Sequence, residues 1–208
     1  ESEKEYAKFS KIYIGKNNSV ISNGVEVRDI KNYPNKKQEN KNDLFSKLSI
    51  ISVCRFVDQK NIKEFIQIAE KLKEYNFILI GNGPKWNDIN NYITSKSLRN
   101  IYLMGTKKNV FTYLKKSDIY LSTSLYEGLP ISIIEAMSIG LPIIASDVIG
   151  NCDAVIHGKS GYLYKLGEVD MAVNYLKKLL NSSELRMKLG KNSQNIQRTI
   201  FSLEKMIN

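Results

Sequence analysis

The sequence contains few of the residues that build disulfide frameworks, zinc sites and histidine-based active sites, with two cysteines and one histidine among 208 residues. Cys54 lies in an expected core strand and Cys152 in an expected loop, a spacing that provides neither a disulfide framework nor a set of metal ligands. His157 has no evident serine, cysteine or metal-ligand partner, and we interpret it as a loop residue. No zinc spacing, P-loop or serine-hydrolase motif is present, and the low cysteine content is typical of a reducing cytoplasm.

Long apolar runs are also missing. No stretch approaches the roughly 20 consecutive apolar residues that cross a bilayer, so we expect no membrane span. The chain opens at Glu1-Ser2-Glu3-Lys4, without an initiator methionine or the apolar core of a signal peptide, and we expect it to be a piece of a longer protein. Its 208 residues, 42% of them hydrophobic, suffice for one substantial core.

The chain is basic, with 31 Lys and Arg against 21 Asp and Glu and a formal charge of +10. Such a charge can serve a nucleic acid, an anionic membrane surface or a phosphorylated ligand. The lysines are interspersed with asparagines, as in residues 36–42, and lack the interleaved aromatic residues of single-strand binders. We therefore interpret most of the charge as a solvated surface and expect no nucleic-acid partner.

From residue 48 onwards, short runs rich in β-branched residues alternate with turns and amphipathic helical stretches. The expected strands are 48–56, 77–80, 101–104, 119–122, 143–145 and a short one at 162–164. The expected helices are 62–75, two that pass through Trp86 and Val110, one that ends at Ser138 before a capping Gly140, and most of 168–208. A short strand at 19–24 and a polar linker at 31–43 precede this pattern. Because the strand runs do not alternate polar and apolar residues, we expect an α/β fold, a doubly wound parallel Rossmann-like sheet with helices on both faces.

Ligands bind doubly wound folds beyond the carboxyl ends of the strands. Five residues fall at or just after an expected strand end: Arg55, Gly81, Gly105, Glu127 and Asp147. We therefore expect them to share one edge of the sheet, although they are far apart in the sequence. The run from Gly81 to Pro84 lacks the third glycine of a dinucleotide fingerprint, and we interpret it as a turn.

The run from Glu127 to Glu135 places two carboxylates on either side of a tight turn and the start of a helix. Gly128 and Pro130 favour such a turn, and the first amides of a helix are unpaired donors for anions or hydroxyls. Glu135 lies among apolar residues, so its carboxylate needs a partner. It is placed to accept hydrogen bonds from a ribose diol, whereas Glu127, nearer the opening, suits a sugar hydroxyl. A structural role for Glu135, capping a turn or pairing with a lysine, is the alternative.

Arg55 and Lys60 flank the turn that follows the first strand. A guanidinium fork grips phosphate oxygens at two points and an ammonium group adds a mobile charge, so the pair suits a diphosphate. On spacing alone, such isolated basic residues are more typical of a solvated surface.

Together these motifs resemble those of the retaining glycosyltransferases of the GT-B fold, in the large group called glycosyltransferases group 1 or family 4. The matching segments are 20–26 (I-x-N-G-V-D in the family), 54–61 (G-R-L-x-x-x-K-G) and 80–84 (V-G-x-G-P). Glu127 and Glu135 match the family's hallmark of two glutamates separated by seven residues, and the match continues to Ser146. The resemblance covers roughly residues 18–200.

By this resemblance the chain is the C-terminal half of the GT-B fold and binds a nucleotide-diphosphate sugar. The implied catalytic residues are Arg55 and Lys60, which would hold the diphosphate, and Glu127, which would contact the transferred sugar. The implied binding residues are Glu135 for the ribose, the loop residues Gly105, Lys107 and Val110 for the base, and the backbone of Gly128, Leu129, Pro130 and Ile131 for the sugar and its phosphate. The family transfers the sugar with retention. The main contribution of the protein is the positive charge that it supplies around the leaving phosphate. The pattern requires neither a metal nor another cofactor.

The resemblance also implies a domain organisation. Residues 1–17 are the expected remnant of an N-terminal domain, 18–200 the nucleotide-sugar-binding domain, and 201–208 the start of a helix that returns to the missing domain. That domain would bind the acceptor, a polysaccharide, lipid-linked or other glycan, in the cytoplasm at the inner face of the membrane. The piece alone is expected to bind the donor weakly and to transfer little sugar.

Three positions depart from the family pattern. Cys54 and Asn61 replace glycines around the Arg/Lys segment, and Ile149 stands where a Gly-Gly pair is common.

Two other functions stay open. A nucleotide-sugar epimerase can share the GT-B architecture, but it needs acid and base groups in the cleft, which a single loop histidine does not favour. The other is a non-catalytic nucleotide-binding module.

Overall fold

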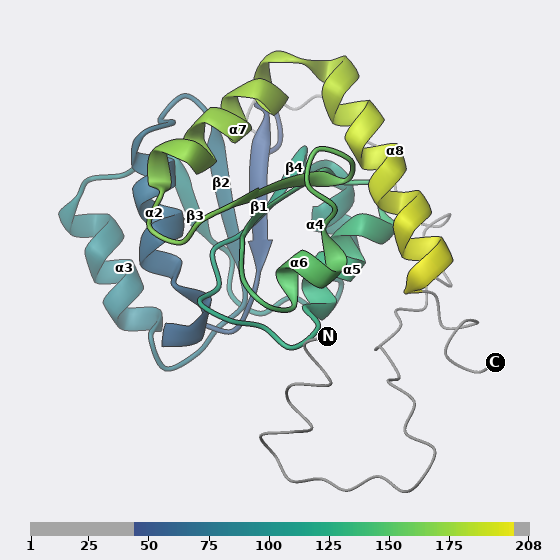
Figure 1. The fold of residues 1–208 in the computed structure, drawn as a ribbon. Helices are drawn as coiled ribbons and strands as arrows, with labels where there is room; N and C mark the ends of the chain where they lie inside the picture. Colours follow the sequence, from purple (N-terminus) through teal and green to yellow (C-terminus); the bar gives the residue numbers. More distant parts are fainter. Residues whose placement is uncertain (1–43, 202–208) are drawn as a thin grey trace, which may run out of the picture.

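Six parallel strands form one sheet in the part of the chain that the structure, a computed structural model, describes, residues 44–201 (Figure 1). The strand order is β3-β2-β1-β4-β5-β6. The strands are β1 (Ser49–Val53), β2 (Asn76–Ile80), β3 (Ile101–Leu103), β4 (Ile119–Ser122), β5 (Ile143–Ser146) and β6 (Gly161–Tyr164). All five pairings are parallel, so the predicted doubly wound α/β fold is confirmed.

Helices cover both faces of this sheet (Figure 1). They are α2 (Ile62–Glu70), α3 (Trp86–Ser95), α4 (Val110–Lys116), α5 (Ile131–Ser138), α6 (Asn151–Ala154), α7 (Val169–Asn181) and α8 (Ser183–Ile200), with a short 3-10 helix, η2 (Asp58–Lys60), before α2. The sequence analysis did not predict η2 and α6, which are only three and four residues long. Such short elements show no hydrophobic periodicity.

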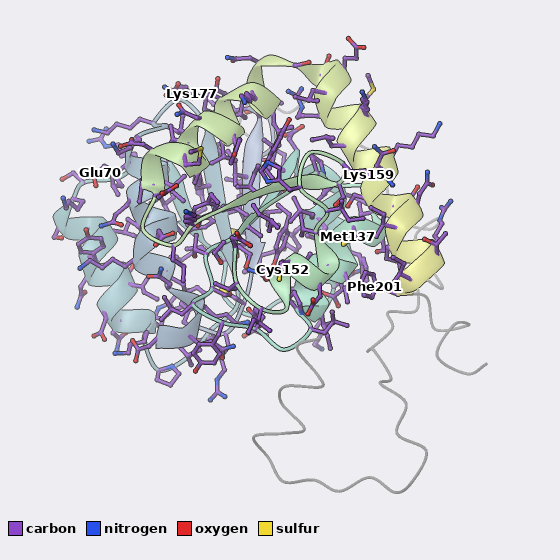
Figure 2. All side chains as sticks on the ribbon, viewed as in Figure 1. Glu70, Met137, Cys152, Lys159, Lys177 and Phe201 are labelled. Atoms are coloured by element: carbon purple, nitrogen blue, oxygen red, sulfur yellow. The ribbon has the colours of Figure 1, made fainter. Side chains whose placement is uncertain are left out.

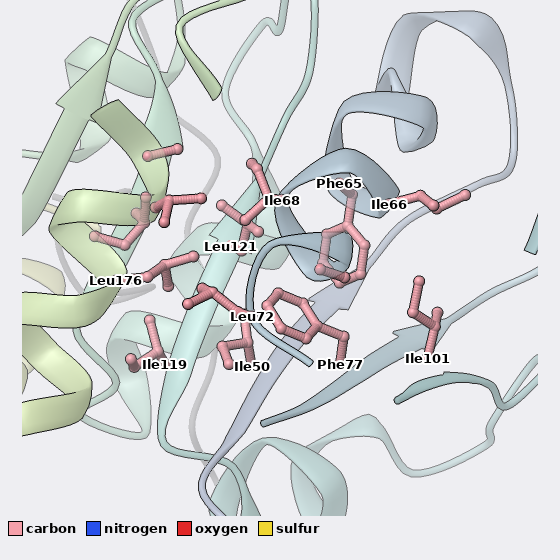
Figure 3. Packing of buried hydrophobic residues seen from close by; sticks show 14 of the residues in the cluster. Ile50, Phe65, Ile66, Ile68, Leu72, Phe77, Ile101, Ile119, Leu121 and Leu176 are labelled. Atoms are coloured by element: carbon pink, nitrogen blue, oxygen red, sulfur yellow. The ribbon is translucent and has the colours of Figure 1, made fainter. Parts of the chain in front are cut away.

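Alternate residues of each strand contribute to two different cores. Ile50, Phe77 and Leu79 pack toward α2, α3 and α7, while Ile51 and Ile78 pack toward α4, α5 and α8. Figure 3 shows the first of these cores, in which the rings of Phe65 and Phe77 meet edge to face, 5.5 Å between centroids. Both faces of the strands are therefore buried, which explains the continuous apolar runs in the sequence.

Most lysines of the helices lie on the outside of these layers. Figure 2 shows Lys177 at the outer surface of α7, whereas Met137 of α5 is fully buried. Within residues 44–201, no helix combines the length and the apolar character that crossing a membrane requires.

One predicted helix end is corrected by tertiary contacts, and one predicted helical region is confirmed as two helices. The helix predicted over 62–75 ends at Glu70, because the side-chain amide of Asn100 donates to the carbonyl oxygens of Ala69, Leu72 and Tyr75. The predicted helical region after residue 168 is two helices. They separate at Ser182, whose hydroxyl accepts a hydrogen bond from the Leu185 amide, a typical N-cap.

The predicted cap after α5 is confirmed, because Gly140 has a φ of +82°. Several other predictions fall outside the described residues: the remnant domain 1–17, the strand at 19–24, the linker at 31–43, and 202–208 of the predicted returning helix.

Candidate functional site

The candidate site lies where the strand order reverses, at the carboxyl ends of β1 and β4. The chain runs outward from β1 through β2 to β3 and then returns to place β4 on the other side of β1. Such a switch point opens a crevice between the loops that follow the two central strands. Here the loops are residues 54–61 after β1 and 123–130 after β4.

Lys60 and Glu127 meet directly between these two loops. The Lys60 Nζ atom donates to Glu127 Oε1 at 2.5 Å, and the Ser124 hydroxyl donates to the same oxygen at 2.6 Å. Only 19% of the Lys60 side chain and 9% of the Glu127 side chain are exposed. The sequence analysis assigned these residues to neighbouring parts of one ligand and did not predict that they pair with each other. Ser124 has no motif of its own and was missed.

Further hydrogen bonds clamp the Glu127 loop onto η2. The Gln59 carbonyl accepts from the Leu125 amide at 2.8 Å, and the Gln59 side-chain amide donates to the Tyr126 carbonyl at 2.9 Å. The Thr123 hydroxyl donates to the carbonyl oxygens of Lys60 and Asn61, at 3.0 and 3.1 Å. These bonds fix the backbone on both sides of the Lys60–Glu127 pair, so its geometry is set before any ligand arrives.

The loop after β5 supports the Glu127 turn from the other side. The Glu127 amide donates to the Ile149 carbonyl at 3.3 Å. The next residue, Gly150, has a φ of +86°, and a Cβ atom built on it would lie 1.9 Å from the Gly128 carbonyl oxygen. Only glycine fits there. Gly150 is absent from the predicted site, although the Gly-Gly pair expected near this position was a signal for it.

A buried polar network continues from this turn into the sheet. The Ser146 hydroxyl at the end of β5 donates to the Ser124 carbonyl at 2.6 Å, and the Asn151 side-chain amide donates to the Ser146 carbonyl and hydroxyl at 3.0 and 3.1 Å. All three residues are buried. These bonds link the loop after β4 to the loop after β5.

A separate cavity of about 310 Å³ opens at the carboxyl ends of β1, β2 and β3. It is lined by Val53, Cys54, Arg55, Ile80, Gly81, Asn82, Thr106, Lys107 and Val110. The structure thus brings Arg55, predicted for the diphosphate, to the same cavity as Lys107 and Val110, predicted for the base, whereas Lys60 does not line this cavity. Gly105 closes the back of this region, because its carbonyl accepts from the Gly81 amide at 3.0 Å.

The lining of this cavity is largely uncharged apart from its two basic residues. Burial raises the pKa of the Cys54 thiol to about 11, so it stays protonated at neutral pH. Arg55 is exposed at the rim, and the Lys107 ammonium lies 5.7 Å from the ring centre of Tyr113. A larger hollow of about 470 Å³ lies between α2 and α3, and none of the predicted site residues lines it.

Glu135 sits on α5, behind the turn, with its side chain partly buried. Within residues 44–201 its carboxylate has no hydrogen-bond or ion-pair partner, whereas its backbone carbonyl accepts from the Ser138 hydroxyl at 2.6 Å. Burial raises the pKa of its carboxyl group above the ordinary value of 4.5. α5 begins at Ile131, directly after Pro130. The Pro130 carbonyl accepts from the Ile133 and Ile134 amides at 3.0 and 3.2 Å, which leaves the amides of Ile131 and Ser132 without an acceptor among residues 44–201.

Comparisons with known proteins place this arrangement in a family. A family model described as "Glycosyl transferases group 1" matches residues 31–196. The chain is 32% identical over 193 residues to UDP-Gal:alpha-D-GlcNAc-diphosphoundecaprenol alpha-1,3-galactosyltransferase of Escherichia coli, a match that covers 85% of this chain and 48% of that protein.

Two solved structures extend the comparison to the fold. A mutant of TarM from S. aureus, in complex with UDP and other ligands, matches with a TM-score of 0.82 at 25% identity, over 99% of this chain and 41% of that one. The C-terminal domain of LpcC, a glycosyl transferase group 1 family protein from Francisella tularensis, matches with a TM-score of 0.71 at 22% identity, over 86% of this chain and 100% of that one. The chain spans about half the length, or less, of the first curated relatives that it matches.

Proposed function

Because the chain belongs to the glycosyl transferases group 1 family, we propose that it binds a nucleotide-diphosphate sugar and forms the donor-binding half of a retaining glycosyltransferase. The observation that carries the proposal is the pairing of Lys60 with Glu127 at the switch point of the sheet. This pairing supports the proposal because an ammonium group suited to phosphate and a carboxylate suited to sugar hydroxyls lie side by side, at the edge where doubly wound folds bind ligands.

Each part of the donor has a counterpart at this edge. Arg55, from the neighbouring cavity, and Lys60 supply two positive charges for the diphosphate. Glu127 binds the transferred sugar, and the amides of Ile131 and Ser132, the first two of α5, bind its phosphate. Glu135 accepts from the ribose hydroxyls. The base lies in the cavity lined by Lys107 and Val110.

The proposed chemistry is electrostatic. The bond between the anomeric carbon and the diphosphate oxygen breaks, and a bond to the acceptor oxygen forms on the same face of the sugar. The departing phosphate takes the acceptor's proton. Arg55 and Lys60 stabilise the negative charge that develops on that phosphate, and no covalent bond to the protein is needed.

The acceptor is bound by a part of the enzyme outside this domain. We propose that residues 1–17 and 201–208 are remnants of this acceptor-binding half and connect it to the domain spanning 18–200. The galactosyltransferase relative from Escherichia coli is named for a diphosphoundecaprenol-linked acceptor. We propose a lipid-linked glycan or a polysaccharide as the acceptor class here too, at the cytoplasmic face of the membrane.

Calorimetric titration of the 208-residue chain tests the donor site. UDP is the first probe, since TarM was solved with UDP, and GDP, ADP and uridine are compared with it. We expect one nucleoside diphosphate to bind and the nucleoside without phosphates to bind far more weakly. Failure of all three diphosphates to bind contradicts the proposal.

An assay on a longer protein, in which the chain is joined to an acceptor-binding half, distinguishes a transferase from an epimerase and from a non-catalytic module. Incubated with its donor alone, a transferase releases free sugar slowly. An epimerised nucleotide sugar among the products overturns the proposal in favour of an epimerase, and tight donor binding without release of sugar indicates a non-catalytic module.

We predict that Glu135→Gln stabilises the free chain at neutral pH and weakens UDP binding. A buried carboxyl with a raised pKa loses its proton at lower pH in the unfolded chain than in the folded one. Ionisation therefore costs the folded state stability as the pH rises from about 4.5 toward the raised pKa, and the cost remains above that. Thermal melts of both chains at pH 4 and pH 8 check this: the gain in melting temperature should be present at pH 8 and smaller at pH 4.

A further inference from the structure

The carboxylate of Glu64 is a buried charged group that the proposed donor site does not use. Only 6% of the residue is exposed. Its Oε2 atom accepts from the Asn61 side-chain amide at 2.9 Å and from the Gly167 backbone amide at 3.2 Å. Its Oε1 atom is buried and has no hydrogen-bond partner among the described residues. Burying a carboxylate this deeply is costly, so its contacts call for an explanation.

The first contact leads to an unusual backbone conformation. Asn61 joins η2 to α2 with φ and ψ both at 45°, in the left-handed region that disfavours most side chains. Asparagine tolerates this region better than most residues, but glycine is the residue that adopts it freely. The Asn61 side chain makes no capping bond to the first turn of α2. It instead donates to Glu64, the third residue of the helix.

Two sets of contacts connect Asn61 to the candidate donor site. The carbonyl oxygens of Asn61 and Lys60 both accept from the Thr123 hydroxyl, which starts the loop that carries Glu127. Lys60 is the last residue of η2, and its ammonium group binds Glu127. The conformation of Asn61 thus sets the direction in which the chain leaves Lys60.

We propose that Glu64 is a positioning residue for the diphosphate site: it holds Asn61 in the left-handed turn and so directs Lys60 into the crevice. The inference rests on the proposed function, in which Lys60 binds the diphosphate. The Gly167 amide, from the loop after β6, fixes the other side of the carboxylate. The Tyr164 hydroxyl is buried nearby, and burial together with the charge of Glu64 keeps its pKa well above the ordinary value of 10.0, so it remains protonated beside the carboxylate.

Charge and positioning predict opposite results when Glu64 is removed. By Coulomb's law alone, removing a negative charge near the site strengthens the binding of an anionic ligand. If Glu64 positions Lys60, its removal weakens that binding instead. A residue that serves only the stability of the fold changes the melting temperature and leaves the affinity of the folded chain unchanged.

UDP titrations of the 208-residue chain distinguish these roles. We expect Glu64→Leu to weaken UDP binding about tenfold, the equivalent of one hydrogen bond to a charged group, and Glu64→Gln to weaken it less because an oxygen acceptor remains. Uridine, which lacks the diphosphate, serves as the control ligand, and its affinity should not change.

A double substitution tests the path through Asn61. Glycine needs no support in the left-handed region, so Asn61→Gly combined with Glu64→Leu should bind UDP within about twofold of Asn61→Gly alone. A full tenfold loss in the Asn61→Gly background overturns the inference. If Glu64→Leu does not fold, as judged by circular dichroism, the same comparison is made with Glu64→Gln.

The failures of the two proposals are distinguishable. Equal or tighter UDP binding by Glu64→Leu contradicts the positioning role alone, since the original chain still binds. If the original chain binds no nucleoside diphosphate, the donor site itself is wrong, and the role of Glu64 falls with it.

Discussion

Replacing Lys60 by methionine is expected to weaken UDP binding by about a hundredfold and to lower the free energy of unfolding by about 2 kcal/mol. The two effects have one cause. Lys60 is bound to Glu127, whose side chain is 9% exposed, and among residues 44–201 the only other group bonded to the same oxygen is the Ser124 hydroxyl. Without Lys60, a nearly buried negative charge remains in the crevice, where it is poorly solvated and repels a diphosphate.

Lys63→Met is the matched control for this experiment. Lys63 lies on α2, three residues further along the chain, and is exposed. Its substitution removes the same charge and the same side-chain length. Urea denaturation and UDP titration of the three chains give both quantities. Equal losses in the two variants would mean that Lys60 acts only through the net charge of the domain.

Glu127→Gln is expected to impair the proposed sugar-binding part of the site without weakening the diphosphate-binding part. Removing the carboxylate charge releases the Lys60 ammonium from its present partner, so UDP itself should bind as tightly as before or several-fold tighter. Transfer or hydrolysis of the donor sugar should fall, because Glu127 is the proposed acceptor for its hydroxyls. A parallel loss of UDP affinity in this variant would contradict the division of roles between Lys60 and Glu127.

The sheet and its edge were predictable because their signals are local. The runs that became β1, β2 and β4 are rich in apolar residues without alternating polar and apolar positions, and a parallel sheet with both faces covered buries such runs. Once the strands are parallel, the residues that follow them must meet at one edge. The meeting of Arg55 and Gly81 in one cavity at this edge was therefore implied by the order of strands and helices, whereas Lys107 and Val110 were implied only by the family resemblance.

The internal contacts of the site were not predictable in the same way. Lys60 and Glu127 are 67 residues apart, and nothing in the local pattern of either indicates a shared hydrogen bond. Similarly, in the sequence Glu64 is one more residue of an amphipathic helix. In the structure it is buried and accepts a hydrogen bond from Asn61 in the preceding turn. Propensity and periodicity describe how one segment folds, whereas these contacts depend on how two loops sit against each other.

Gly150→Ala is expected to be the most damaging single substitution for the fold of the site, lowering the free energy of unfolding by about 3 kcal/mol. The new methyl group would lie 1.9 Å from the Gly128 carbonyl oxygen and 2.8 Å from that of Glu127, both of them backbone atoms that cannot rotate aside. The loops after β4 and β5 must therefore separate.

Gly158→Ala isolates the steric part of this effect. Gly158 also has a positive φ, +74°, but a Cβ atom there would meet nothing within 4 Å. Its substitution should cost only the left-handed backbone strain, about 1 kcal/mol. Urea denaturation of both variants measures the difference.

The same pair of variants links the packing of Gly150 to the binding of the donor. Separation of the two loops breaks the bond from the Glu127 amide to the Ile149 carbonyl and moves the start of α5, whose first amides are proposed to bind the phosphate. Gly150→Ala should then lose UDP affinity even at temperatures where it remains folded, while Gly158→Ala retains it. If folded Gly150→Ala binds UDP normally, the position of the Glu127 turn does not govern the diphosphate site, and the support that the loop after β5 gives to this turn serves only stability.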